Sequence, residues 1–122
     1  MAGMQIKREI IVFDAADLDA ESGFWATLLD GRVDKEDDWH TVYVNGEPRY
    51  GVQLAPGHVP PDWPDGAPQQ IHLDLYVEDI NAGHEHALAS GARLLQDADR
   101  AADEGFVVYA DPAGHPFCLC WG

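Results

Sequence analysis

The chain has 122 residues, of which 46% are hydrophobic, and this is enough for one globular domain or for two very small units that share one core. The formal net charge of −15 argues against nucleic-acid binding, because the protein would repel phosphate backbones. The same charge is compatible with a cationic ligand, or it serves solubility alone. No apolar run reaches the roughly 18 residues of a membrane span, and residues 1–9 lack the apolar stretch of a signal peptide, so we expect a cytoplasmic protein without membrane contacts.

The first half predicts a strand, a helix and three further strands. β-branched and aromatic residues favour a strand over 6–13 (IKREIIVF). Asp17 is placed to cap an amphipathic helix over 18–29, with Gly31 expected at its C-terminal cap. The remaining strands are expected at 32–36, 39–44 and 49–55, with the turn signal Asn45-Gly46 between the last two.

Residues 56–69 hold five prolines and two glycines, which predicts a linker. The large aromatic residue of this segment is Trp63, a candidate for a lid over a binding site.

The second half repeats the order of the first. A strand is expected over 70–77, and Asp79 is placed to cap a helix that runs to about Ser90 and ends at Gly91. Further strands are expected at 93–96, 106–110 and 116–121. Neither half buries both faces of its sheet alone, so the two should share a core. We therefore predict an α+β single domain over 1–122, built from two βαβββ modules (about 5–55 and about 70–122) around a central cleft.

Because successive side chains of a strand point to opposite faces of the sheet, one face should pack on a helix and the other should line the cleft. Ile71, Leu73, Leu75 and Val77 should pack on a helix, as should Phe117, Leu119 and Trp121. The opposite face should point into the cleft, and its members are Ile10, Val12, Gln53, His72, Asp74, Tyr76, Cys118 and Cys120.

The repeated order, with HLDLYVEDI at 72–80 and YADPAGHPFCLCW at 109–121, resembles the vicinal oxygen chelate superfamily. Its members include glyoxalase I, extradiol dioxygenases, and the bleomycin and fosfomycin resistance proteins. The resemblance extends over nearly the whole chain and is strongest to small bacterial glyoxalase-like domain proteins. It implies a small-molecule site between curved mixed sheets and, because related proteins often complete their sites across a dimer interface, a homodimer.

In metal-using members of the superfamily, the ligands come from the first and last strands of each module, usually as histidines and glutamates. Carried onto this chain, the fifth-strand ligand is His72 and the eighth-strand ligand falls on Cys118. The first-strand ligand falls on or near Ile10, and the fourth on Gln53 or, with other turn lengths, Gly51. The resemblance thus implies a divalent metal for which the usual ligand set is incomplete, so we expect no cofactor. A zinc site from His72 and Cys118, with or without Cys120, stays chemically admissible.

The candidate catalytic residues are His72, Asp74 and Cys118. His72 is suited to act as a general base or ligand, or else it lines a pocket as a remnant of a metal site. Asp74 is expected to share a ligand with His72 rather than bond it directly, because residues i and i+2 of a strand lie about 7 Å apart. Otherwise it is a carboxylate bonded to solvent or to the backbone. Cys118 is a nucleophile, a ligand, or a small buried hydrophobe. His84 and His86 are expected on the surface.

The candidate ligand-binding residues combine aromatic and polar side chains able to contact a planar or cationic molecule. They are Trp39, Tyr43, Gln53, Trp63, Tyr76 and Cys120. Three functions follow: a small-molecule-binding protein without the usual metal site, an atypical lyase, isomerase or dioxygenase that uses His72, and a regulatory or partner-binding domain whose centre is only core.

Overall fold

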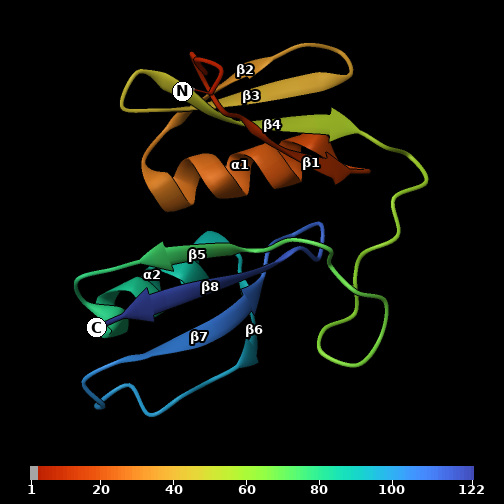
Figure 1. Cartoon of the computed structure of the whole chain (residues 1–122). Coiled ribbons are helices and arrows are strands. Elements are labelled where there is room, and N and C mark those ends of the chain that lie inside the picture. Colours follow the sequence, from red (N-terminus) through yellow and green to blue (C-terminus); the bar gives the residue numbers. More distant parts are fainter. Residues whose placement is uncertain (1–2) are drawn as a thin grey trace.

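The structure, a computed structural model that describes residues 3–122, contains two βαβββ modules joined by a long linker (Figure 1). Module one consists of β1 (Ile11–Ala15), α1 (Leu18–Leu29), β2 (Arg32–Lys35), β3 (Trp39–Val44) and β4 (Glu47–Leu54). Module two consists of β5 (Leu73–Tyr76), α2 (Ile80–Ser90), β6 (Arg93–Gln96), β7 (Gly105–Ala110) and β8 (Pro116–Trp121). The predicted α+β class and element order are confirmed. Within the described residues, neither helix has the length and apolar character needed to cross a membrane.

The two sheets have the same topology. Their strand orders are β1-β4-β3-β2 and β5-β8-β7-β6. The first strand of each module pairs in parallel with the last, and the other pairs are antiparallel. A parallel pair needs a crossover connection, which the helix of each module provides.

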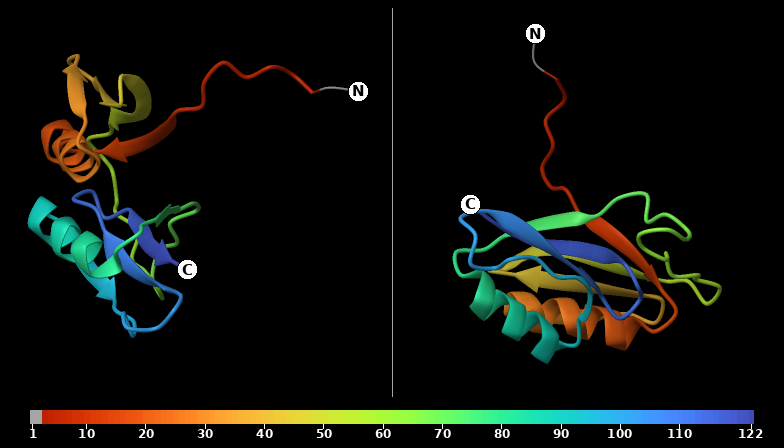
Figure 2. Two further views of the ribbon diagram at one scale, coloured as in Figure 1. Left: turned by 90° about the vertical axis from the view of Figure 1, so that its left-hand side faces the viewer. Right: turned by 90° about the horizontal axis from the view of Figure 1, so that it is seen from below.

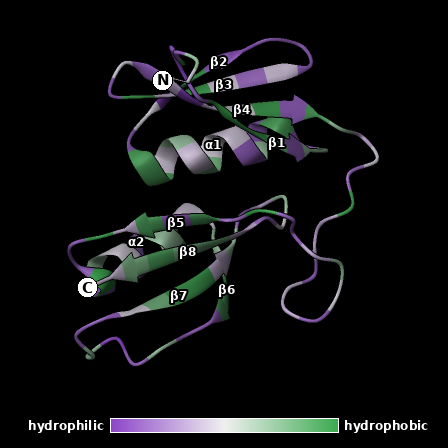
Figure 3. Ribbon diagram, in the orientation of Figure 1, coloured by the Kyte–Doolittle hydropathy of each residue, from purple (hydrophilic) through white to green (hydrophobic). Residues whose placement is uncertain are grey.

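Both helices lie on the inner side of their sheets, and α1 contacts α2 across the boundary between the modules (Figures 1 and 2). The core is continuous across this boundary. Trp25 of α1 is fully buried, stacks on Phe13 at a centroid distance of 5.2 Å, and meets Phe117 of module two at 5.2 Å. Figure 3 shows hydrophobic residues along much of β7 and β8, the strands that cover α2. The expectation that the halves share one core is therefore confirmed.

The helix caps follow the sequence at three of the four ends. The side chains of Asp17 and Asp79 accept hydrogen bonds from the backbone N–H groups of Ala20 (3.0 Å) and Ala82 (3.1 Å). Gly91 ends α2 in the left-handed region, with φ of 114°.

At the C-terminal end of α1 the prediction for Gly31 is wrong. Asp30 is the residue that adopts the left-handed conformation, with φ of 54°. Gly31 is required for a different reason, since a Cβ there would collide with the backbone carbonyl oxygen of Tyr43.

The first strand of each module begins later than the sequence predicts. β1 starts at Ile11, which pairs with Tyr50, and the preceding segment has no partner strand and extends away from the body (Figure 2). β5 starts at Leu73, so Ile71 is 67% exposed instead of packing on a helix. Hydrophobic β-branched residues favour extended backbone, but an extended segment is a strand only where it pairs with a neighbouring strand.

The expected surface position of His84 is also wrong. This residue is buried, and its Nδ1 lies 2.7 Å from the Tyr109 hydroxyl. The partner is on β7, so the helix alone gives no sign of it. His86 is exposed, as expected.

Two glycines of module one make a matched pair. We expect Gly31→Ala to lower the free energy of unfolding by about 1–3 kcal/mol, because the added methyl group has no room beside Tyr43. Gly23→Ala, inside α1 with open space at its Cβ position, should raise it by about 0.5–1 kcal/mol through helix propensity. Urea unfolding of both variants measures the difference, and equal effects would contradict the assigned close approach.

Candidate functional site

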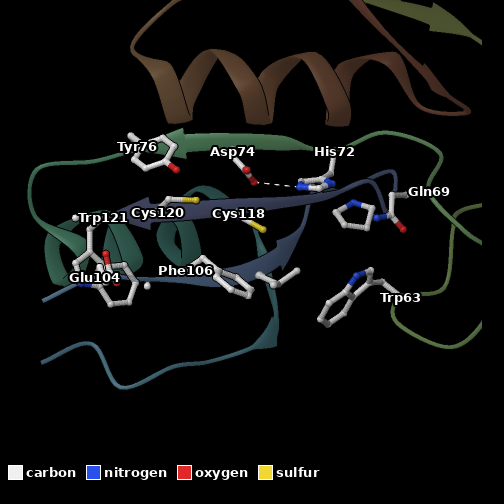
Figure 4. Close-up of a pocket in the computed structure, with 14 residues that line it drawn as sticks. Trp63, Gln69, His72, Asp74, Tyr76, Glu104, Phe106, Cys118, Cys120 and Trp121 are labelled. Atoms are coloured by element: carbon white, nitrogen blue, oxygen red, sulfur yellow. Dashed lines mark ion pairs between the residues drawn. The ribbon is translucent and has the colours of Figure 1, made fainter. Parts of the chain in front are cut away.

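The open face of the module-two sheet forms a cavity of about 640 Å³, here called the module-two cleft (Figure 4). Its floor is made by β5, β7 and β8, and one side is made by the linker. The lining residues are Trp63, Gln69, His72, Asp74, Tyr76, Glu104, Gly105, Phe106, Val108, Pro116, Cys118, Cys120, Trp121 and Gly122.

Strand alternation places the module-two side chains on the predicted sides of the sheet, whereas Ile10, Val12 and Gln53 of module one do not line this cleft. Leu73, Leu75, Phe117 and Leu119 pack in the core on the helix side. The alternate residues of β5 and β8 line the cleft, and the parallel pairing sets Asp74 opposite Cys118 and Tyr76 opposite Cys120. Trp121 packs against the core and also borders the cleft, where its Nε1–H donates to the Ala102 carbonyl at 2.8 Å.

His72 and Asp74 interact directly, so the expectation that they would only share a ligand is wrong. His72 Nε2 lies 3.1 Å from Asp74 Oδ1, and the side chains are 45% and 48% exposed (Figure 4). The backbone separation of i and i+2 residues is bridged because the imidazole is long enough to lean along the strand. The carboxylate therefore orients the imidazole ring at the wall of the cleft.

Both thiols are free and buried on the cleft side of β8. Burial, together with the nearby charge of Asp74, raises the pKa of Cys118 to about 12 and also raises the pKa of Cys120. Without a bound cation the thiols are protonated at neutral pH, which opposes a role as nucleophiles.

Aromatic side chains surround the thiols. Trp63 of the linker packs beside Cys118 and Cys120, so it lies at the cleft as a lid residue would. Tyr76 is 74% exposed and Phe106 is 50% exposed. The cleft thus exposes the Tyr76 and Phe106 rings to the solvent.

Three predicted ligand-binding residues lie elsewhere, on the open face of the module-one sheet. Trp39 covers Gly51, where its ring leaves no room for a Cβ, and its Nε1–H donates to Thr41 at 3.1 Å. The Arg32 guanidinium lies over Tyr43, with its central carbon 4.1 Å from the centroid of the tyrosine ring. Gln53 is exposed and pairs with Trp39 in the sheet register. Within one chain these residues do not line the module-two cleft.

A buried carboxyl pair at the boundary of the modules was missed by the sequence analysis. Trp25 Nε1–H donates to Glu21 Oε2 (3.3 Å) and to Asp111 Oδ2 (3.0 Å). The Ala113 N–H donates to the other oxygen of each carboxyl, at 3.0 and 3.1 Å. The spacing of Glu21 and Trp25 on one helix face was the available signal, but their partner comes from the turn between β7 and β8.

The usual metal-ligand set of the resembled superfamily does not fit module one. Ile10 offers no donor atom, and Gln53 offers an exposed amide that does not line the module-two cleft. At the alternative fourth-strand position, Gly51, the Trp39 ring occupies the space. Among residues 3–122, two mixed groups have ligand atoms within 4.8 Å of one another. They are His72, Asp74 and Cys118 in the cleft, and Glu21, Asp111 and His115 at the module boundary.

The glyoxalase-like domain model matches residues 10–120. Among solved structures, the fosfomycin resistance protein FosX from Listeria monocytogenes superposes with a TM-score of 0.72 at 14% identity, with 98% of this chain and 95% of that one covered. FosX from Mesorhizobium loti gives 0.72 at 13%, covering 98% and 94%. A glyoxalase/bleomycin resistance protein from Albidiferax ferrireducens T118 gives 0.67 at 14%, covering 94% and 98%. No curated protein matches the chain.

The buried pair predicts a specific pH dependence of stability. Burial, followed by the hydrogen bond and charge of Asp111, raises the pKa of Glu21 from 4.5 to about 10. The folded protein therefore holds this proton more tightly than the unfolded chain does. The contribution of Glu21 is fully present below pH 4.5 and is lost as the pH rises toward 10.

Glutamine at position 21 is neutral at every pH, so Glu21→Gln should not lose stability in this way. Between pH 4.5 and 10 we expect the free energy of unfolding of Glu21→Gln to rise, relative to that of the unmodified protein, by up to about 1.4 kcal/mol per pH unit. Urea unfolding at several pH values measures the difference. Exposed Glu85→Gln on α2 is the control and should show no such trend. Parallel pH profiles for Glu21→Gln and the unmodified protein would contradict a protonated Glu21.

Proposed function

The chain belongs to the glyoxalase-like domain family of the vicinal oxygen chelate superfamily, and from this premise we propose that it binds a small organic cation with an aromatic or apolar body in the module-two cleft. The observation that carries the proposal is the lining of the cleft. It combines aromatic rings with the carboxyl groups of Asp74 and Glu104, and no lysine or arginine is among its described lining residues.

The size of the cleft supports a small-molecule ligand. A volume of about 640 Å³ falls inside the range of about 300–1,000 Å³ that is usual for ligand pockets. The third candidate function, a regulatory domain with a filled centre, receives no support from an open cavity of this size.

The electrostatics of the cleft support the cationic class. An ammonium or amidinium group within about 6 Å of an aromatic ring gains about 0.5–2 kcal/mol, and more so where water is excluded. Trp63 and Phe106 offer such rings, and Asp74 offers a formal charge from the floor. The overall charge of −15 adds long-range attraction for the same ligands.

We propose in addition that two copies associate so that a partner covers the cleft. The exposed Tyr76 and Phe106 form an apolar mouth that one copy leaves in water. The open face of module one carries Trp39 and Gln53, which lie outside the cleft of their own chain and are available to a neighbour's cleft. The free Cys118 and Cys120 thiols support the proposed location in the reducing cytoplasm.

An atypical enzyme is the second candidate, and the His72–Asp74 contact of 3.1 Å favours it. A carboxylate that fixes one imidazole nitrogen is the usual arrangement for a general base. In this candidate, His72 would take a proton from a substrate held in the same cleft.

Ligand binding is tested with a panel of aromatic cations, followed by thermal shift and calorimetry in the presence of a chelator. We expect Trp63→Ala and Asp74→Asn each to weaken binding by roughly tenfold, as loss of one ring or one charge at a partly open site implies. Glu47→Gln, which removes an exposed charge outside the cleft, should leave the affinity unchanged. Equal affinity for neutral isosteres would contradict the cationic class. Conversion of the ligand, lost in His72→Ala, would favour the enzyme.

The dimer is tested by light scattering during size-exclusion chromatography. We expect Tyr76→Glu to convert dimers to monomers, because it places a charge in the apolar mouth of the cleft. Leu88→Glu, a comparable change on exposed α2, should leave the dimer intact. A monomeric unmodified protein would refute the proposed association.

A further inference from the structure

A second cavity, of about 210 Å³, lies at the boundary of the modules and is here called the boundary pocket. Its lining comes from β1, from the residues around the starts of β5 and β8, and from His58 of the linker. The pocket adjoins the module-two cleft, because Gln69, His72 and Pro116 line both cavities. The proposed cation site uses other side chains, so this space is left without a function.

Three of the six histidines of the chain line the boundary pocket. His58 belongs to the linker, His72 immediately precedes β5, and His115 immediately precedes β8. The rings of His58 and His115 lie beside each other, with their centroids 5.1 Å apart. The fold thus gathers imidazole rings from three separate segments at one small cavity, which gives the pocket a polar wall.

Backbone hydrogen bonds fix which nitrogen of two of these rings carries the proton. His58 Nε2 lies 2.9 Å from the Ala113 carbonyl oxygen, and His115 Nε2 lies 2.8 Å from that of Asp14. A carbonyl oxygen only accepts, so Nε2 is the donor, and Nδ1 of the neutral ring is left as an acceptor. Among residues 3–122, neither Nδ1 has a hydrogen-bond partner and no unpartnered side-chain nitrogen is buried, so both Nδ1 atoms are accessible.

The rest of the lining favours a neutral aromatic molecule. Phe13, Trp25 and Phe117 contribute aromatic rings to the pocket. Asp14 is the one formally charged residue among the described residues of the lining, so the pocket repels anions. An apolar cavity of about 150 Å³ is enough to bind benzene. A pocket of about 210 Å³ therefore has room for one ring with a small substituent.

We propose that the boundary pocket binds a single aromatic ring that carries a hydroxyl or amino group, and that this group donates a hydrogen bond to Nδ1 of His115. The His115 ring lies 5.2 Å from the ring of Phe13, so its acceptor is next to the apolar part of the pocket. The His115 N–H donates to Asp111 Oδ1 at 2.8 Å and the imidazole Nε2–H donates to the Asp14 carbonyl, so the residue is held from two sides. The acceptor is therefore in position before the ligand arrives. This site is independent of the proposed function, which concerns a cation in the module-two cleft.

The experiment titrates the full, ¹⁵N-labelled chain with phenol, anisole and benzoate at pH 8, where imidazole is ordinarily neutral, and follows binding by NMR. We expect saturable binding of one phenol per chain, with shifts of the Phe13 and Asp14 amides and of His115 Nδ1. Anisole has the same ring but no donor, so it should bind about three- to tenfold more weakly, as the loss of one hydrogen bond implies. Benzoate should bind more weakly than phenol, because it is an anion. His115→Phe keeps a ring but removes the acceptor, and it should bind phenol no better than anisole.

His86→Phe is the matched control. The His86 Nε2 also bonds a backbone carbonyl, that of Leu28 at 3.1 Å, but the residue lies on α2 outside the pocket, so phenol binding should be unchanged. If His115→Phe does not fold, the unmodified protein decides alone, through the protonation of His115 Nε2 and the response of Nδ1 to phenol.

Equal affinity for phenol and anisole, no saturable phenol binding, or an equal loss in His86→Phe would overturn the site. Phenol-induced shifts confined to Phe106 and Cys120 would place the ring in the module-two cleft and would also overturn it. Binding of aromatic cations in the cleft is measured separately by calorimetry, so failure of the boundary pocket and failure of the proposed function are distinguishable.

Discussion

The joining of the two modules depends on Trp25. Its indole ring stacks on Phe13 in module one and meets Phe117 in module two, while its Nε1–H is shared between Glu21 and Asp111. Neither module has a second layer to cover its helix, so each uses the helix of the other. The hydrophobic contacts of Trp25 stabilise the joined modules but do not fix their geometry, because hydrophobic burial is non-directional. The hydrogen bonds from the indole N–H to the two carboxyl groups fix the relative orientation of α1 and the turn before β8.

That orientation determines where a site can form. Because the helices meet at the inside, the opposite faces of both sheets turn outward, and each is an open surface (Figures 1 and 2). The turn held by Asp111 leads directly into β8, since the His115 N–H donates to Asp111 Oδ1 at 2.8 Å. β8 in turn sets the register of Cys118 against Asp74. The turn at the buried junction therefore leads directly into β8, the strand that carries the two thiols of the cleft.

The sequence predicts what depends on local periodicity and fails where a distant partner decides. Strand alternation was enough to separate Cys118 and Cys120 from Phe117 and Leu119, and the N-terminal caps followed from single aspartates. The Glu21–Asp111 pair and the His84–Tyr109 contact were out of reach, because each joins an element to another far along the chain. For the same reason the aromatic residues of module one could be assigned to a face but not to a cleft.

The two modules share a topology but not the chemistry of their open faces. In module one, Trp39 lies on Gly51, so an aromatic ring fills the sheet face at one of the two positions, Gln53 or Gly51, onto which the resemblance carries the fourth-strand ligand. In module two, the corresponding face keeps His72, Asp74 and two thiols above an open cavity. A fold with two equivalent halves needs only one of them to bind a ligand, and the other is then free to serve as a cover. The asymmetry of the two faces, more than the incomplete metal set, is the reason to look for the function in module two.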